Sequence, residues 1–142
     1  MIPVTLIHET AFVKIEANPE LRYVQITWLQ QPSSTLFQKE TRNLVQYALT
    51  NNFNKSLFDV RKRDFLDIAD QNWLVRDIFP LFKGRIIQLA YLVNSAGLEI
   101  MDTFRIHDCV INNPELKRSV QIEIFLDIED ALQWLLKEAP VA

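Results

Sequence analysis

The stretch KRSVQIEIFLDIEDALQWLLKEAPVA, residues 117–142, contains a complete strand and helix with their start and stop signals. Apolar residues at positions 120, 122, 124 and 126 alternate with the residues between them, the period of a strand with one buried face. Asp127 follows as an N-cap, because its carboxylate can accept hydrogen bonds from free backbone amides. An apolar stripe then runs from Ala131 to Leu136, and Pro140 ends the helix. This stretch predicts that the fold ends with a strand followed by a helix.

The same alternation of strand and helix extends back through the chain. Alternating or continuous apolar runs predict strands at residues 4–7, 12–17, 23–30, 56–60 and 86–93. Apolar residues at helical spacing predict helices that start at Ser33 or Ser34, at Asp67 or Asp70 and at Ser95. The first ends near Leu49 and the third near His107, and Pro80 kinks or ends the second. Residues 112–114 read as a turn. The expected fold is α/β, a mixed sheet with an N-terminal antiparallel hairpin, mostly parallel remaining strands and about four helices.

Length and composition predict one domain over residues 1–142. A chain of this length buries roughly two thirds of its unfolded surface, enough for a core without disulfide or metal support. Hydrophobic residues make up 49% and charged residues 23% of the sequence, which is ordinary globular usage. Only 2 glycines are present, which argues against glycine-rich phosphate loops and against an all-β fold rich in tight turns.

The charge pattern argues against a nucleic-acid partner. The formal net charge is -3, whereas nucleic-acid binding needs a basic stripe. The nearest basic run is Arg61, Lys62 and Arg63, flanked by Asp59 and Asp64. We expect this run to be a solvated loop.

Cysteine usage and hydropathy point to the cytoplasm. The single Cys109 cannot form an internal disulfide, which favours a reducing compartment. Residues 1–10 lack the basic start and long apolar run of a signal peptide. The longest apolar run, residues 86–93, is far shorter than the ~20 residues of a membrane span. We therefore expect a cytoplasmic protein without a membrane span.

The order of elements and a few marked residues resemble the STAS-like, SpoIIAA-like domains of bacteria. The likeness covers residues 12–137 and rests on a hairpin ending in Trp28, a short strand ending in Asp59 and Arg61, a helix centred on Trp73, and the ending Phe125-x-Asp127-x-x-x-Ala131-x-x-Trp134-Leu135. This family includes anti-sigma-factor antagonists, regulatory domains of transporters and many stand-alone bacterial proteins. Its fold is also similar to that of lipid-carrying CRAL-TRIO domains. The resemblance implies a compact mixed sheet packed with helices.

One departure from the family concerns its regulatory switch. In the antagonist branch, an Asp-Ser pair in the loop before a helix carries a regulatory phosphate. The corresponding residues 61–67 contain no serine or threonine. A phosphate has no attachment point in this loop, so we assign no phosphorylation site.

Polar residues beyond two predicted central strands form the most site-like group. Asp59 and Arg61 follow residues 56–60, and Asn94 and Ser95 follow residues 86–93. Open parallel sheets place ligands beyond the carboxyl ends of their strands, where the strand order reverses. Asp59 and Arg61 share a face of an extended segment. They can hold a polar ligand together with Asn94 and Ser95, or they can pair with each other and tie the loop to the next helix.

No catalytic or metal-binding group stands out. His107 and Cys109 lie two apart near a predicted helix end, and side chains at that spacing on a helix do not face each other. A metal site needs three or four ligands, and the chain has two histidines and one cysteine. We therefore assign no catalytic residue, no metal and no cofactor. Trp28 and Trp73 are expected in the core, whereas Trp134 stands beside an apolar stripe as a candidate interface residue.

Three hypotheses of function remain. The leading one is a non-enzymatic regulatory or protein-interaction module, used in a homodimer. The second is a carrier or sensor of a small apolar, lipid-like ligand, supported by 9 phenylalanines and the CRAL-TRIO likeness, which needs an apolar cavity of about 300 Å³ or more. The third is an enzyme that uses Asp59, Arg61 and His107, which requires these side chains to converge.

Overall fold

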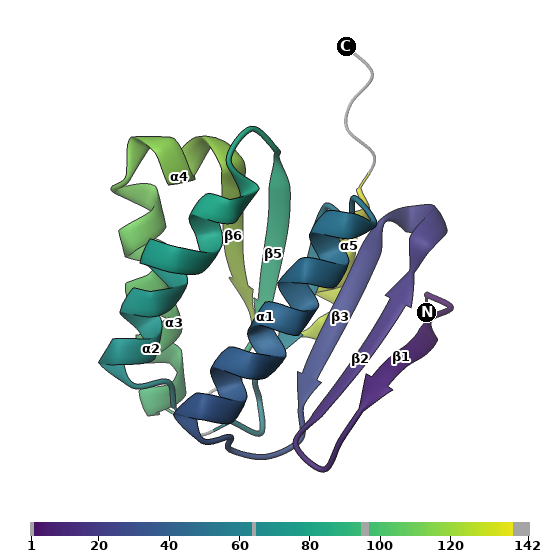
Figure 1. The fold of residues 1–142 in the computed structure, drawn as a ribbon, viewed down its shortest axis with the longest axis horizontal. Helices are drawn as coiled ribbons and strands as arrows, with labels where there is room; N and C mark the ends of the chain where they lie inside the picture. The colour runs from purple at the N-terminus through teal and green to yellow at the C-terminus, as the bar shows by residue number, and fades with distance from the viewer. Residues whose placement is uncertain (1, 64, 95–96, 138–142) are drawn as a thin grey trace.

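A six-stranded mixed β-sheet forms the centre of the molecule (Figure 1). The structure is a computed structural model that describes residues 2–63, 65–94 and 97–137, with the backbone alone for residues 97–101. The strands are β1 (Thr5–Glu9), β2 (Val13–Asn18), β3 (Tyr23–Trp28), β4 (Lys55–Asp59), β5 (Ile87–Leu92) and β6 (Val120–Phe125). They lie in the sheet in sequence order. β1, β2 and β3 are antiparallel neighbours, and β3 to β6 are parallel, so the predicted α/β fold is confirmed.

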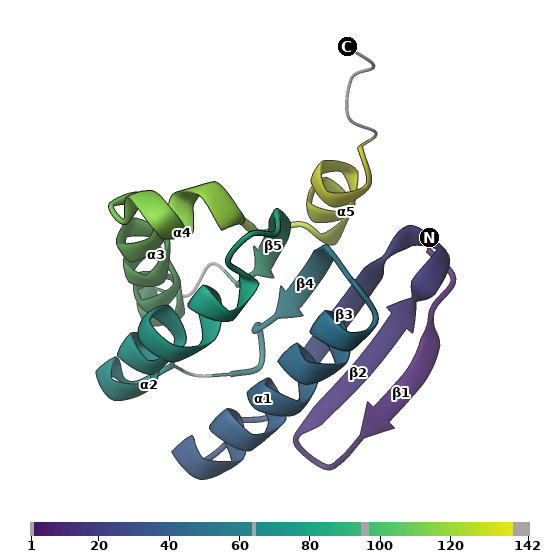
Figure 2. The ribbon, with the colours of Figure 1, turned by 45° about the horizontal axis from the view of Figure 1, so that its top comes forward.

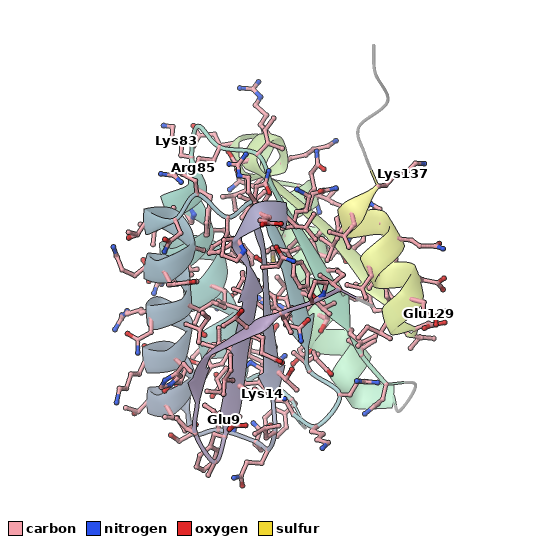
Figure 3. The ribbon with its side chains drawn as sticks, turned by 90° about the vertical axis from the view of Figure 1, so that its right-hand side faces the viewer. Glu9, Lys14, Lys83, Arg85, Glu129 and Lys137 are labelled. Carbon is pink, nitrogen blue, oxygen red and sulfur yellow. The ribbon has the colours of Figure 1, made fainter. Side chains whose placement is uncertain are left out.

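Helices cover both faces of the sheet. They are α1 (Ser34–Thr50), α2 (Ile68–Trp73), α3 (Gly97–Ile111), α4 (Pro114–Ser119) and α5 (Ile128–Leu136). A π turn η2 (Leu74–Ile78) and a 3₁₀ turn η3 (Phe79–Phe82) continue α2, and a short 3₁₀ turn η1 (Pro19–Leu21) joins β2 to β3. Figures 1 and 2 show α1 to α4 on one face of the sheet. Figure 3 shows α1 and α5 on opposite sides of it.

The strand order never reverses in this sheet. Each connection between parallel strands leads to the next neighbour, and α1, α2 and α3 all return over the same face, as successive crossovers of one hand must. Ligand crevices in open α/β sheets form where the order reverses. The sheet has no such point, so its topology does not support a ligand at Asp59 and Arg61, and that site stays a prediction.

The predicted helix starts are confirmed in three cases. The Ser33 hydroxyl accepts a hydrogen bond from Leu36 N–H at 3.2 Å and caps α1. Asp67, not Asp70, caps α2. Asp127 caps α5 by accepting from Glu129 N–H at 2.9 Å. Each cap satisfies a backbone donor that the first turn of a helix leaves without a partner.

The structure corrects one predicted turn and one predicted helix end. The predicted turn at residues 112–114 is the start of α4, which Asn113 caps while Pro114 takes the first helical position. α3 runs on to Ile111, beyond the predicted end at His107. Pro80, predicted to kink or end the second helix, lies in the first turn of η3, where its missing N–H is not needed and where the helical path has changed from π to 3₁₀.

Two apolar clusters lie on the two faces of the sheet. The larger one packs α1 to α4 against one face and includes Trp28 and Trp73, both buried as predicted. The smaller one packs α5 against the other face and includes Leu57, Ala90 and Leu92. β5 contributes side chains to both, which explains its continuous apolar run.

Candidate functional site

Asp59 and Arg61 form a bidentate ion pair just beyond the end of β4. Arg61 Nε donates to Asp59 Oδ1 at 2.9 Å and Arg61 Nη2 donates to Asp59 Oδ2 at 2.7 Å. The backbone N–H of Arg61 donates to the same Oδ1 at 3.2 Å. These hydrogen bonds raise the pKa of the Arg61 guanidinium. The carboxylate of Asp59 is therefore occupied by its neighbour two residues on.

Asn94 joins this pair from the end of β5. Its Nδ2 donates to the carbonyl oxygen of Arg61 at 2.8 Å. Beside it, the N–H of Val60 donates to the Leu92 carbonyl at 3.0 Å and prolongs the pairing of β4 with β5. The structure thus brings Asp59, Arg61 and Asn94 together, and their bonds tie one loop to the next strand. Ser95, the fourth predicted member, lies outside the described residues.

Arg63 is buried, so the prediction of a solvated loop was wrong for this residue. Only 4% of it is exposed. Its Nη2 lies 3.6 Å from Asp102 Oδ2, a carboxylate on α3 that is itself buried. Its guanidinium carbon lies 5.8 Å from the centre of the Phe37 ring. Burial lowers the pKa of Arg63, and the negative charge of Asp102 opposes that effect.

The Arg63 guanidinium is incompletely bonded. Its Nε is buried and has no hydrogen-bond partner among the described residues. Asp102 is only an ionic neighbour, because 3.6 Å is longer than a hydrogen bond; its oxygens accept from the Leu66 N–H and from Thr103 Oγ1. Buried guanidinium donors normally have partners, since leaving one without a bond costs roughly 1–3 kcal/mol or more. Arg63 is therefore the polar side chain in this core that most requires an explanation.

An apolar cavity of about 40 Å³ lies between the sheet and the helical layer. Its wall consists of side chains from β3, α1, β4, η2, η3 and β5, with Arg63 and Tyr91 among them. Burial raises the pKa of the Tyr91 phenol. The cavity is far smaller than the ~300–1,000 Å³ of ordinary ligand pockets. A lipid-like ligand would therefore require the helices to separate from the sheet.

The residues of the enzyme hypothesis do not converge. Asp59 lies at the carboxyl end of β4. His107 lies on α3 about 15 Å along the helix axis from its start, at 1.5 Å per residue, toward the amino end of β6. Its Nδ1 lies 3.9 Å from Asp108 Oδ1 on the same helix. Among the described residues, no three His, Cys, Asp or Glu side chains form a group that could hold a metal ion.

Trp134 lies half-buried on α5. Its ring stands 5.8 Å from that of Phe125 at an angle of 46° and packs at the margin of the smaller cluster. One face of α5 thus covers the sheet, and Trp134 stands at the edge of that face.

Four large apolar side chains are exposed near the carboxyl ends of the parallel strands. Phe65 lies between β4 and α2 and Ile68 begins α2, whereas Leu126 lies between β6 and α5 and Ile128 begins α5. We call these four residues the carboxyl-end rim. Exposed charges flank the rim, basic ones at Arg61 and Lys62 and acidic ones at Asp127, Glu129 and Asp130. Figure 3 shows Glu129 near the start of α5.

Sequence reasoning missed the Arg63–Asp102 pair, although one signal for it was present. Asp102 shares a helical face with Ile106 and Val110, which are both buried. A carboxylate on the apolar stripe of a helix implies a buried partner. The sequence does not say which cation that partner is.

Comparison with known proteins finds no significant match among protein-family models, curated proteins or solved structures. Of the helices in the described part of the chain, none is long and apolar enough to cross a membrane.

Proposed function

We propose that this chain is a non-enzymatic regulatory module of STAS-like type, which acts in the cytoplasm through protein contacts and pairs with a second copy of itself. The observation that carries the proposal is the carboxyl-end rim, four exposed apolar side chains that follow β4 and β6; the Asp59–Arg61–Asn94 bonds tie the loop after β4 to the end of β5. Clustered exposed apolar side chains mark interaction surfaces. Loops held by a rigid scaffold commonly carry binding residues.

The charges around the rim favour a second copy as the partner. The loop after β4 is basic at Arg61 and Lys62, whereas the start of α5 is acidic at Glu129 and Asp130. In a two-fold pairing, the same surface of both copies is used, so the basic loop of one copy faces the acidic helix start of the other. The rim supplies the apolar centre of such an interface.

Substitution of one rim residue tests this proposal. Ile68→Asp puts a charge in the apolar centre, and Ile86→Asp is its matched control, because the two isoleucines are 63% and 67% exposed. Ile86 directly precedes β5, so it lies at the amino end of the parallel strands and away from the carboxyl-end rim. Its neighbour Arg85 lies at the other end of the molecule from Glu9 and Lys14 (Figure 3). We expect sedimentation across a dilution series to show a dimer for the wild type and Ile86→Asp, and a monomer for Ile68→Asp.

Salt and concentration give independent readings of the same interface. Added salt should shift the wild type toward monomer, because it screens exposed charges. A wild type that stays monomeric through the series would overturn the proposal. So would two aspartate variants with the same oligomeric state.

A further inference from the structure

We propose that the cavity beside Arg63 is a binding site for a small carboxylate with a short apolar tail. The site lies inside the molecule and does not involve the carboxyl-end rim. It can therefore be tested separately from the proposed self-association. Its elements are a buried guanidinium whose Nε has no partner in the described part of the chain, a phenol and an apolar chamber.

The polar end of the cavity offers a donor without an acceptor. Arg63 Nε is buried and has no partner among the described residues, and Tyr91 lines the same cavity. A carboxylate has two oxygens, and the fork of a guanidinium matches their spacing. Asp102 approaches Nη2 and not Nε, and at 3.6 Å it makes no hydrogen bond, so it does not satisfy the Nε donor. An acceptor for Arg63 Nε is missing among the residues that the structure describes.

The remaining wall determines the rest of the ligand. Most of the side chains that line the cavity are apolar, including Leu44, Val45, Ile78 and Phe79. A volume of about 40 Å³ is a few times the ~10–15 Å³ that one water requires. This space suits a carboxylate with a tail of one to three carbons and excludes a long acyl chain.

One wall of the cavity is irregular helix. Leu74 and Ile78 belong to the π turn η2, in which the Phe79 N–H donates to the Leu74 carbonyl five residues back. Phe79 and Phe82 belong to η3. Such π turns are uncommon and often occur at functional sites. Their backbone hydrogen bonds depart from the regular α-helical pattern, which changes where the side chains are placed. Side chains of this irregular segment thus form one side of the cavity wall.

A titration with sodium propionate tests the site at the atom in question. The side-chain Nε–Hε signal of Arg63 is followed in ¹H–¹⁵N spectra and is assigned from its loss in Arg63→Met. We expect this signal to shift and saturate at millimolar propionate, since five heavy atoms support only weak binding. Lys62→Met is the matched control, an exposed neighbour whose loss leaves the titration unchanged.

A second variant keeps the test valid if Arg63→Met fails to fold. Ala48 lines the cavity from α1, so Ala48→Leu fills the chamber while it retains the guanidinium. We expect this variant to weaken propionate binding at least roughly tenfold, because the tail loses its space. Binding that is unchanged in Ala48→Leu would overturn the placement of the ligand.

Two further compounds define the chemistry. Propionamide keeps the shape of propionate without the charge, and equal binding of the two would overturn the assignment of an anion. Octanoate exceeds the cavity, and tighter binding of octanoate than of propionate would overturn the size limit. An Arg63 signal that does not move with propionate would overturn the site itself.

Discussion

Arg63 is a charged side chain held almost entirely inside an apolar core. Taking a guanidinium out of water costs several kcal/mol, and a nearby carboxylate offsets this cost only in part. Asp102 is that carboxylate, at 3.6 Å, and it also accepts from the Leu66 N–H. The pair therefore joins the loop after β4 to α3. Removal of one member leaves the other as a buried charge without a partner.

Asp102→Ala should lower the free energy of unfolding by about 3–5 kcal/mol, because it leaves Arg63 buried without its counter-charge. Asp108→Ala is the matched control on the same helix, since the Asp108 side chain is 74% exposed, and it should cost less than about 0.5 kcal/mol. Urea melts of both variants give the comparison. Equal midpoints would mean that the Arg63–Asp102 contact contributes nothing to stability.

At the scale of residues, the sequence predicts what depends on near neighbours. The Asp59–Arg61 pair follows from two alternate residues of an extended segment, and the structure contains it. The burial of Arg63 depends on Asp102, which lies far along the chain and is brought close only by the packing of α3. Arg61 and Arg63 are both basic residues of one short run. The fold leaves one exposed and buries the other.

At the scale of elements, capping chemistry determines where the helices begin. Ser33, Asp67 and Asp127 each have extended backbone angles and a side-chain oxygen that accepts from the first turn. The sequence predicts such starts because the signal is local. α4 was missed because Asn-Pro serves equally well in a turn and at a helix start. Only the packing of Leu116 into the core decides between them.

Asp127→Ala should lower the free energy of unfolding by about 1 kcal/mol, because the Glu129 N–H loses its acceptor. Asp127→Asn keeps a side-chain acceptor at the same position and should lose much less. Urea melts distinguish the two variants. If the alanine and asparagine variants are equally destabilised, the effect comes from the charge of Asp127 and not from its hydrogen bond.

At the scale of the whole molecule, the sheet separates two apolar clusters, and each holds a buried tyrosine. Tyr91 belongs to the larger cluster and Tyr23 to the smaller one around α5. Burial raises the pKa of both phenols, and the charge of Glu16 adds to the effect at Tyr23. Both faces of the sheet therefore favour the protonated phenol. This could not be predicted from the sequence, because the face on which each tyrosine lies depends on strand register.

Alkaline pH should unfold the protein through these two tyrosines. A phenol whose pKa is raised in the folded state contributes stability that is complete below the unfolded pKa of about 10 and is lost as the pH rises above it. Each further pH unit costs up to about 1.4 kcal/mol for each buried tyrosine, until its folded pKa is reached. Tyrosinate absorbance and circular dichroism, followed together from about pH 9 upward, should show the buried phenols ionising only as the helices melt. Tyr91→Phe removes one titrating group from the larger cluster, so its stability should fall less steeply with pH. Phenols that ionise fully while the circular dichroism stays native would show that Tyr23 and Tyr91 are accessible to solvent in the folded protein.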